Sequence, residues 1–392
     1  MKPPAKGSDV VVVGGGLVGT SMAYELVAAG ADTILIDRHD PGRATDAGAG
    51  ILSPETGLDP DPVLFAFAMA AAQHYPALAE RLAGDGATES GFAVTGSLLV
   101  AERPGDDQVM ETAVGLVQQR CPGLVEEIGP PEASRHFPPL GQVRRALYNP
   151  VGRRVDGRAL NAALRSAALS RGLRVMDADV TGLDADRARG SVDGVLTGDG
   201  TVAAGAVVVC GGAWSAPLAD ALDAPLPVRP LKGQIVHLVL PSVDIRAWSI
   251  VQPVLGFYLV PWPDGRVACG GTMEASAGYD CRPTADGVHQ LLRECLRTAP
   301  GLAQATLADV RVGLRPSCVD GRPVLGRVPG WANAYVATGH GAEGLLLGPL
   351  SARLVARQVL DAGPLVDRPG DELAHQVLEY CAPDRFVGMA PV

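Results

Sequence analysis

Apolar positions near the N-terminus follow two different spacings in turn. Val10 to Val13 form a β-branched run, and apolar residues then recur at helical spacing from Leu17 to Val27. Gly30 supplies a helix stop, and Thr33 to Ile36 form a second apolar run. The pattern predicts a strand, a helix and a second buried strand within residues 8–38.

Further along the chain, two kinds of residue pattern alternate. The first predicts helices joined to short buried strands. The second predicts antiparallel strands separated by Pro and Asp-Gly turns, together with a helix. The first covers an Ala-rich helix at 63–82, a helix at 157–170 capped by Asp156, and strands at 173–176, 192–197 and 207–209. The second covers short strands and a helix at 106–120 within 92–140, strands at 233–240, 257–262 and 266–273, and a helix at 285–298.

Three glycines lie between the first strand and the first helix, in the pattern Gly14-x-Gly16-x-x-Gly19. Gly14 permits the turn, Gly16 lets the backbone approach a pyrophosphate, and Gly19 lets the helix pack on the strand. Asp37 ends the second strand, where a carboxylate accepts hydrogen bonds from ribose hydroxyls and disfavours a 2′-phosphate. Glycine makes up 49 of 392 residues, so the motif alone is weak, but its strand–helix context predicts an FAD or NAD site. A plain βαβ unit is the alternative.

The alternation of these two residue patterns predicts two interleaved domains. A nucleotide-binding domain is expected at 1–90, 142–225 and 308–392, and a substrate-binding domain at 91–141 and 226–307. The chain length exceeds the ~250–300 residues that a single core usually serves, which agrees with two domains.

Composition narrows the class of protein. A formal charge of -10 and a pI near 5.2, without a basic cluster, disfavour nucleic acid and anionic membranes as partners. No run approaches the ~20 apolar residues of a membrane span. The first residues contain no apolar segment typical of a signal peptide, so we expect a cytoplasmic protein that binds small molecules. The seven cysteines contain no Cys-x-x-Cys pair and indicate neither a metal site nor a disulfide framework.

Two segments of the last third carry a family resemblance. They are GLRPSCVDGRPVLG, residues 313–326, and ATGHGAEGLLLGP, residues 337–349. With the N-terminal glycines they resemble the D-amino acid oxidase superfamily of FAD enzymes, within it the glycine oxidases, amino acid dehydrogenases and related secondary-amine oxidoreductases. The resemblance implies an α/β fold in which an FAD-binding Rossmann-type domain, similar to that of glutathione reductase, is interleaved with an α+β substrate domain built on a mostly antiparallel sheet.

The resemblance also implies a noncovalently held FAD. A helix that starts near Leu345 would direct its positive N-terminal end at the flavin ring. The residues expected to bind the cofactor are Gly14, Gly16, Leu17, Val18, Gly19, Asp37, Arg38, Thr45, Ala49, Gly50, Ile51, Val180, Gly211, Gly212, Trp214, Gly313, Arg315, Gly341, Ala342, Glu343, Gly344, Leu345 and Leu346.

Four residues match positions in the family's catalytic centre. Arg315 matches an arginine that clamps the substrate carboxylate. A guanidinium suits this role because it is planar, permanently charged and able to donate two parallel hydrogen bonds. The alternative is a structural arginine at a strand end. Tyr258 matches a tyrosine that also touches the carboxylate, although a core tyrosine would look the same. Met273 matches a pocket wall, a place that a methionine on an inward strand face would also take. His340 is expected to order the flavin loop by hydrogen bonding rather than to act as a base.

Three positions depart from related branches. Ala342 stands where glycine oxidases carry a second arginine, so the pocket provides for only one carboxylate. Ala268 and Gly313 stand where sarcosine oxidases carry an oxygen-activating lysine and a flavin-linked cysteine. These differences imply noncovalent FAD and leave oxidase activity open.

The expected function is FAD-dependent oxidation of the C–N bond of a small amino or imino acid, glycine-, D-amino acid- or proline-like, by hydride transfer to flavin N5. The acceptor is O2 or a quinone, and a homo-oligomer is left open. The alternative is a flavin-dependent 2-hydroxy acid oxidoreductase of the 2-hydroxyglutarate or glycerol-3-phosphate type. A base beside the substrate carbon would favour that alternative, because an alcohol must lose its O–H proton.

Overall fold

The first of two large sheets is a mainly parallel sheet made of valine-rich strands. The computed structural model describes residues 7–59, 61–361 and 371–389. The strand order is β10–β11–β12–β1–β2–β9, with β19 beside β12 and β18 beside β19. The parallel strands are β1 (Ser8–Val13), β2 (Thr33–Asp37), β9 (Arg174–Asp177), β12 (Gly200–Val209) and β19 (Ala334–Thr338), and the antiparallel ones are β10 (Val180–Asp186), β11 (Ser191–Thr197) and β18 (Val324–Arg327). Apolar cores cover both faces of the parallel strands, which explains their continuous apolar runs.

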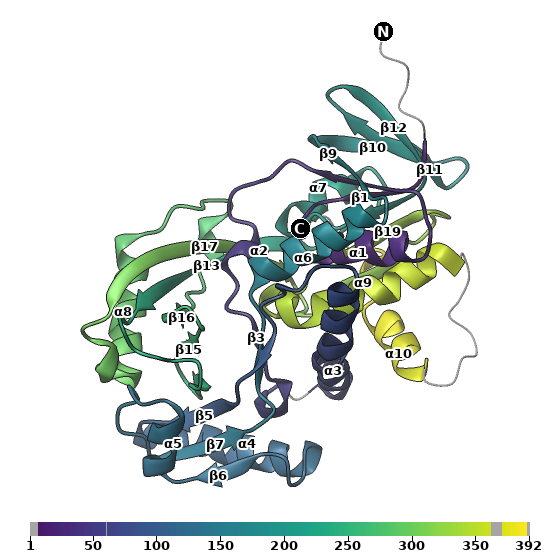
Figure 1. Cartoon of the computed structure of the whole chain (residues 1–392). Helices are drawn as coiled ribbons and strands as arrows, with labels where there is room; N and C mark the ends of the chain where they lie inside the picture. Colours follow the sequence, from purple (N-terminus) through teal and green to yellow (C-terminus); the bar gives the residue numbers. More distant parts are fainter. Residues whose placement is uncertain (1–6, 60, 362–370, 390–392) are drawn as a thin grey trace.

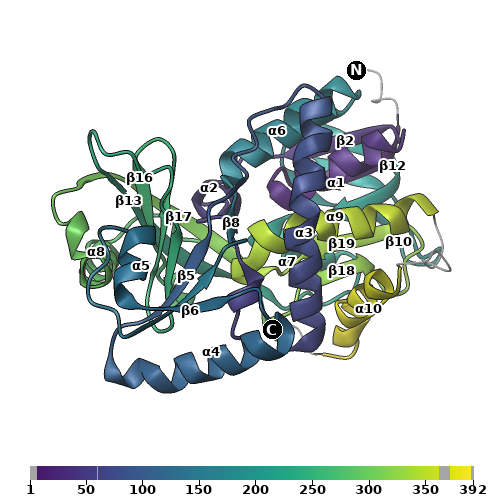
Figure 2. The same ribbon diagram turned by 60° about the horizontal axis from the view of Figure 1, so that its bottom comes forward.

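Helices cover one face of this sheet. The first core cluster joins Val12 of β1 to Met22, Leu164 and Val355 on three helices. The α6 helix begins where the Asp156 carboxylate accepts hydrogen bonds from the backbone N–H groups of residues 158 and 159. Figure 2 shows the long helix α3 crossing α9, with which it is in contact. The helices are α1 (Leu17–Ala28), α3 (Pro62–Gly84), α6 (Gly157–Ser170), α9 (Gly344–Asp361) and α10 (Glu372–Tyr380).

The second sheet is antiparallel apart from one strand pair. Its order is β17–β13–β16–β15–β14–β5–β7–β6, and only β14 and β5 run parallel. Helix α8 (Ala285–Thr298) packs Leu291 and Cys295 into the core beneath it. The strands are β5 (Ser97–Ala101), β6 (Glu126–Ile128), β7 (Arg145–Asn149), β13 (Val228–Val239), β14 (Ile250–Pro253), β15 (Tyr258–Pro261), β16 (Arg266–Gly270) and β17 (Thr306–Cys318), flanked by α4 (Asp107–Arg120) and α5 (Pro130–His136).

A small sheet and short helices lie between the two large sheets (Figure 1). The small sheet holds β3, β8 and β4 in that order. Helix α2 reaches β17 of the second sheet, so the first sheet's connections contact the second sheet directly. These elements are β3 (Ile51–Leu52), β4 (Ala93–Val94), β8 (Arg153–Arg154), α2 (Ala44–Ala47), η3 (Gly212–Trp214) and α7 (Ser215–Asp220).

The fold class expected from the sequence is confirmed. Two expected domain boundaries fall at different places from the sheet boundaries. The boundary at 308 lies inside β17, which pairs with β13 along its length, and the chain returns to the first sheet only at β18. The boundary at 141 precedes β7, which pairs with β5 in the second sheet. We propose that the domains change over near residues 150 and 320. The sequence pattern gives no signal for these positions, because strand pairing depends on residues far apart in the chain.

No helix among the described residues is long and apolar enough to cross a membrane. The first six residues, for which the sequence argued against a signal peptide, lie outside the described residues.

Candidate functional site

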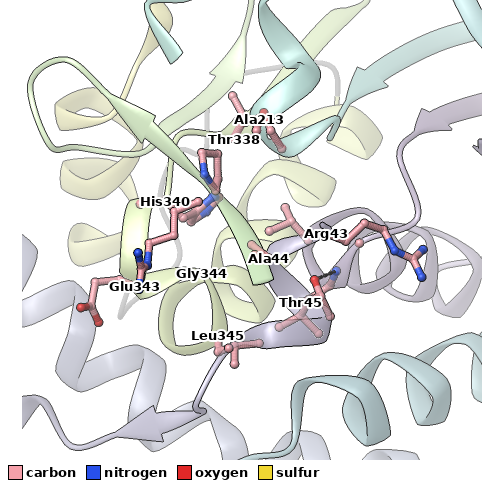
Figure 3. Close-up of a pocket in the computed structure, with 18 of the residues that line it drawn as sticks. Arg43, Ala44, Thr45, Ala213, Thr338, His340, Glu343, Gly344 and Leu345 are labelled. Atoms are coloured by element: carbon pink, nitrogen blue, oxygen red, sulfur yellow. Dashed lines mark hydrogen bonds between the residues drawn. The ribbon is translucent and has the colours of Figure 1, made fainter. Parts of the chain in front are cut away.

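A cavity of about 820 Å³ opens at the carboxyl ends of β1, β2, β12 and β19 and extends to the second sheet. In open α/β sheets this edge is the usual place of a ligand. In Figure 3, Arg43 and Thr45 lie on one side of the cavity and His340 and Glu343 on the other. The cavity is therefore bounded by segments from both ends of the chain.

The three motif glycines meet different surroundings. A Cβ on Gly14, whose φ is +106°, would lie 2.5 Å from the Cys210 carbonyl oxygen, and one on Gly19 would lie 1.9 Å from the Gly14 carbonyl oxygen. Both glycines are required by the fold itself. A Cβ on Gly16 would meet nothing closer than Thr45 Oγ1 at 3.4 Å, and Gly16 lines the cavity. Packing alone does not demand glycine there, so the open space fits a ligand that approaches the backbone, as the pyrophosphate of a dinucleotide does.

The N-terminus of α1 is tied to the small-residue loop beside it. Gly16 is the N-cap residue, and the Leu17 N–H donates to Thr45 Oγ1 at 2.9 Å. Thr45 thus fixes the loop against the end of the helix where an anion is favoured.

Asp37, expected to bind ribose, already has partners. Its Oδ2 accepts a hydrogen bond from Arg43 Nη1 at 2.9 Å and lies 3.1 Å from His39 Nδ1. A Cβ on Gly15 would lie 2.6 Å from the same oxygen, so the carboxylate sits directly against the glycine turn. Arg43 holds the carboxylate in place, and the ribose contact stays a prediction.

His340 is buried and holds the turn between β19 and α9. Its Nε2 lies 2.9 Å from Ser351 Oγ, whose own hydroxyl donates to the Leu347 carbonyl at 2.9 Å. Nε2 therefore carries the proton and donates to the serine. Burial lowers the pKa of His340 to about 4, which keeps the ring neutral. This is the contact expected of a residue that orders the loop.

Arg315 and Tyr258 converge from two strands of the second sheet. A Cβ built on Gly271 would lie 2.9 Å from Arg315 Nη2 and 3.1 Å from Tyr258 Oη, so both groups face the same point. Arg315 Nη1 donates to the Thr272 carbonyl at 2.8 Å, and the described residues provide no carboxylate partner for its guanidinium. Burial raises the pKa of Tyr258 to about 12, against the lowering effect of the Arg315 charge. The pair offers a permanent cation and a protonated phenol to a carboxylate.

The Thr272 carbonyl is itself fixed by a buried polar network. The Thr272 hydroxyl accepts from the Gln234 N–H at 2.9 Å and donates to Glu274 Oε1 at 2.6 Å. Glu274 also accepts from Gln234 Nε2 at 2.7 Å and faces Lys232 Nζ at 3.4 Å. The network fastens the segment after β16 to β13 and so fixes one side of Arg315.

One expected catalytic residue lies elsewhere. Met273 was expected to form a pocket wall, but it follows the end of β16, is 72% exposed and does not line the cavity. Thr272 turns inward to its buried partners, so the next side chain points outward. Gly19 likewise does not line the cavity, because it packs behind the turn. The other residues expected at the cofactor and the catalytic centre all line the cavity.

The sequence did not single out Arg43 or Thr272, although both contact site residues. Arg43 could have been noticed as a charge in a loop of small residues. Thr272 acts through its backbone carbonyl, for which a side-chain pattern gives no signal. The loop at 57–59 and Leu64 and Phe65 of α3 also line the cavity.

Comparison with known proteins gives consistent matches over nearly the whole chain. The model of a protein family described as FAD dependent oxidoreductase matches residues 9–358. Glycine oxidase of Pseudomonas putida is 32% identical over 364 residues, covering 92% of this chain and 96% of that protein. The crystal structure of iminodiacetate oxidase from Chelativorans sp. BNC1 is 37% identical, with a TM-score of 0.87 over 95% of this chain and 98% of that one. Glycine oxidase from Geobacillus kaustophilus is 27% identical, with a TM-score of 0.85 over 97% and 99%.

Proposed function

This chain belongs to the family of FAD dependent oxidoreductases, and we propose that it oxidises the C–N bond of a small amino or imino acid to an imine, which water hydrolyses to an oxo acid or which stays cyclic. The glycine oxidase and iminodiacetate oxidase similarities support an amine donor. The substrate we favour is glycine-like or proline-like.

The observation that carries this proposal is the convergence of Arg315 and Tyr258 at the cavity. A carboxylate placed between them would receive a two-pronged charged donor and a phenolic O–H. Held at that end, the carbon next to the carboxylate has one fixed orientation relative to the rest of the cavity, which is the positioning that hydride transfer needs.

When bound, FAD supplies the ring whose N5 accepts a hydride. The chain's own part is to bind, orient and desolvate. The Gly14–Gly16 turn and the N-terminal end of α1, which Thr45 holds, would receive the pyrophosphate, and the start of α9 would direct its positive end into the same cavity. Arg315 and Tyr258 hold the carboxylate. An amine bound in its neutral form then requires no strong base for C–H cleavage.

The hydroxy acid alternative is less well supported. An alcohol needs a base for its O–H proton, and the ring of His340 is a weak base because burial lowers its pKa to about 4. The neighbours named above are oxidases of glycine and iminodiacetate.

We further propose that a dye or quinone is a better acceptor than O2. Ala268 is buried beside Val260 and Trp262 and has no charged side chain of its own. A fixed positive charge would stabilise the negative charge that develops as oxygen is reduced. The test compares peroxide release with dye reduction over glycine, sarcosine, both prolines, D-alanine and D-glutamate. Preference for D-glutamate would contradict the pocket assignment, and rapid peroxide release without a dye advantage would contradict the acceptor assignment.

A further inference from the structure

Glu343 is a charged residue of the cavity that the mechanism above does not use. It ends the short turn η6 (Gly341–Glu343) between His340 and α9. It lines the same cavity as Arg315 and Tyr258, and its side chain keeps accessible surface there. Figure 3 shows its carboxylate on the side of the cavity away from Arg43 and Thr45, that is, away from the dinucleotide turn.

The carboxylate of Glu343 has no hydrogen-bond or ion-pair partner within the part of the chain that the structure describes. Its backbone N–H donates to the His340 carbonyl, which fixes the turn, and its side chain stays exposed in the cavity. Burial, with a smaller contribution from Asp59, raises the pKa of Glu343. An acid without a partner inside a cavity favours a ligand that brings a cation or a hydrogen-bond donor.

The other charges of the cavity divide into two groups. Those at the dinucleotide end are paired among themselves: Asp37 with Arg43, and Arg38 with Asp40 and Asp179. Arg315, Glu343 and Asp59 also line the cavity, and no ion pair is found for them among the described residues. Of the groups that affect the pKa of Tyr258, Glu343 has the smallest effect, which is to raise it.

We propose that Glu343 is a specificity-determining residue that repels a second carboxylate on the substrate and favours a neutral or cationic group in its place. The inference rests on the proposed function, because it takes the first carboxylate to be held by Arg315. It deepens that function by naming the substrate class: amino or imino acids with one carboxylate, including N-alkyl glycines and amino acids with a basic side chain. A dicarboxylic substrate would place a second negative charge beside an uncompensated acid, so the inference separates this chain from the similar iminodiacetate oxidase, whose named substrate has two carboxylates.

A pair of inert ligands isolates the second carboxylate. (Methylthio)acetate and thiodiacetate share a thioether and one carboxylate, differ in the second carboxylate, and have no amine to oxidise. Their binding to the FAD-loaded protein is measured by calorimetry at about pH 8, to favour the ionised form of Glu343. The variants are Glu343→Gln and, as a matched control for net charge, Glu80→Gln, at an exposed position of α3 that does not line the cavity.

We expect the unmodified protein and Glu80→Gln to bind (methylthio)acetate at least about tenfold more tightly than thiodiacetate, and Glu343→Gln to bring the two within about threefold. Equal affinities in the unmodified protein, or a ratio that Glu343→Gln leaves unchanged, would overturn the inference while leaving the proposed function standing. If neither ligand binds and no amine reduces the flavin, the proposed function fails, and this inference fails with it.

Discussion

The guanidinium of Arg315 lies against the backbone of Gly233, so closely that a Cβ at position 233 would stand 2.3 Å from Nη1 and 2.5 Å from Cζ. The two residues belong to neighbouring antiparallel strands, where Gly233 pairs with Gly313 and Arg315 pairs with Leu231. The absence of a side chain on Gly233 thus leaves room for the guanidinium, and the Thr272 carbonyl holds one edge of the guanidinium by accepting a hydrogen bond. The position of the carboxylate clamp therefore depends on a residue without a side chain.

The first prediction follows from that contact. Gly233→Ala should displace the guanidinium and lower kcat/KM by about 100-fold, because catalysis is sensitive to misplacement of about 1 Å. FAD content should stay near that of the unmodified protein, since the substitution leaves the dinucleotide turn at Gly14 and Gly16 intact. Gly115→Ala, in α4 with nothing near its Cβ position, is the matched control and should keep full activity. A Gly233→Ala protein with normal kinetics would show that the arginine position is not critical.

Removing the arginine itself gives a second prediction. Arg315→Ala should cost about 3–5 kcal/mol of transition-state stabilisation, measured from kcat/KM, because one partner of a desolvated pair is lost. Arg315→Lys should not restore activity, since a point charge cannot replace the planar fork. Turnover near that of the unmodified protein in either variant would mean that Arg315 is structural.

The glycine turn allows cofactor binding and folding to be separated. Gly16→Ala has room for its methyl group in the protein, so we expect normal thermal unfolding of the FAD-free form but FAD binding weakened by at least about tenfold. Gly14→Ala should instead lower the stability of the FAD-free protein, because its Cβ would meet a backbone carbonyl at 2.5 Å and its φ is +106°. Unchanged FAD affinity in Gly16→Ala would contradict the assigned pyrophosphate site.

Buried histidines predict a loss of stability in mild acid. Burial lowers the pKa of His237 and of His340 to about 4, from 6.5. Between pH 4 and pH 6.5 the unfolded chain binds more protons than the folded protein. The stability that comes from burying the neutral histidines is therefore fully present above pH 6.5 and is lost as the pH falls towards 4. Each histidine should lower the free energy of unfolding by up to about 1.4 kcal/mol per pH unit. Urea unfolding from about pH 7 to about pH 5 measures the slope, which His237→Gln should make shallower; an unchanged slope would contradict the burial effect.

The sequence predicted those features that depend on neighbouring residues. The strand–turn–helix around Gly16 and the helix at 285–298 follow from local spacing, and the structure places both as expected. Arg315 could be found because its motif is local. Its surroundings could not: Gly233 and Thr272 reach it only through the pairing of β17 with β13 and the turn after β16.

The direction in which a side chain points was the second property that the sequence did not predict reliably. Residues 266–273 alternate as a strand would, which placed Met273 on an inward face. The strand ends at Gly270 instead, and buried hydrogen bonds then turn Thr272 inward and Met273 outward. Glu343 lay in the expected cofactor segment, but its unpaired carboxylate is a property of three-dimensional packing.

The most direct measurement of the central claim is anaerobic reduction of the bound flavin by matched pairs of substrates. Glycine and glycolate, or D-alanine and D-lactate, differ only in whether the carbon that loses the hydride carries nitrogen or oxygen, and so in whether a C=N or a C=O double bond forms. The absorbance of oxidised FAD is followed after mixing without oxygen, in the unmodified protein and in Arg315→Ala. We expect bleaching by at least one amine among glycine, sarcosine, the prolines and D-alanine, none by its hydroxy acid counterpart, and much slower bleaching in Arg315→Ala. Bleaching by hydroxy acids with none by the amines would contradict the account.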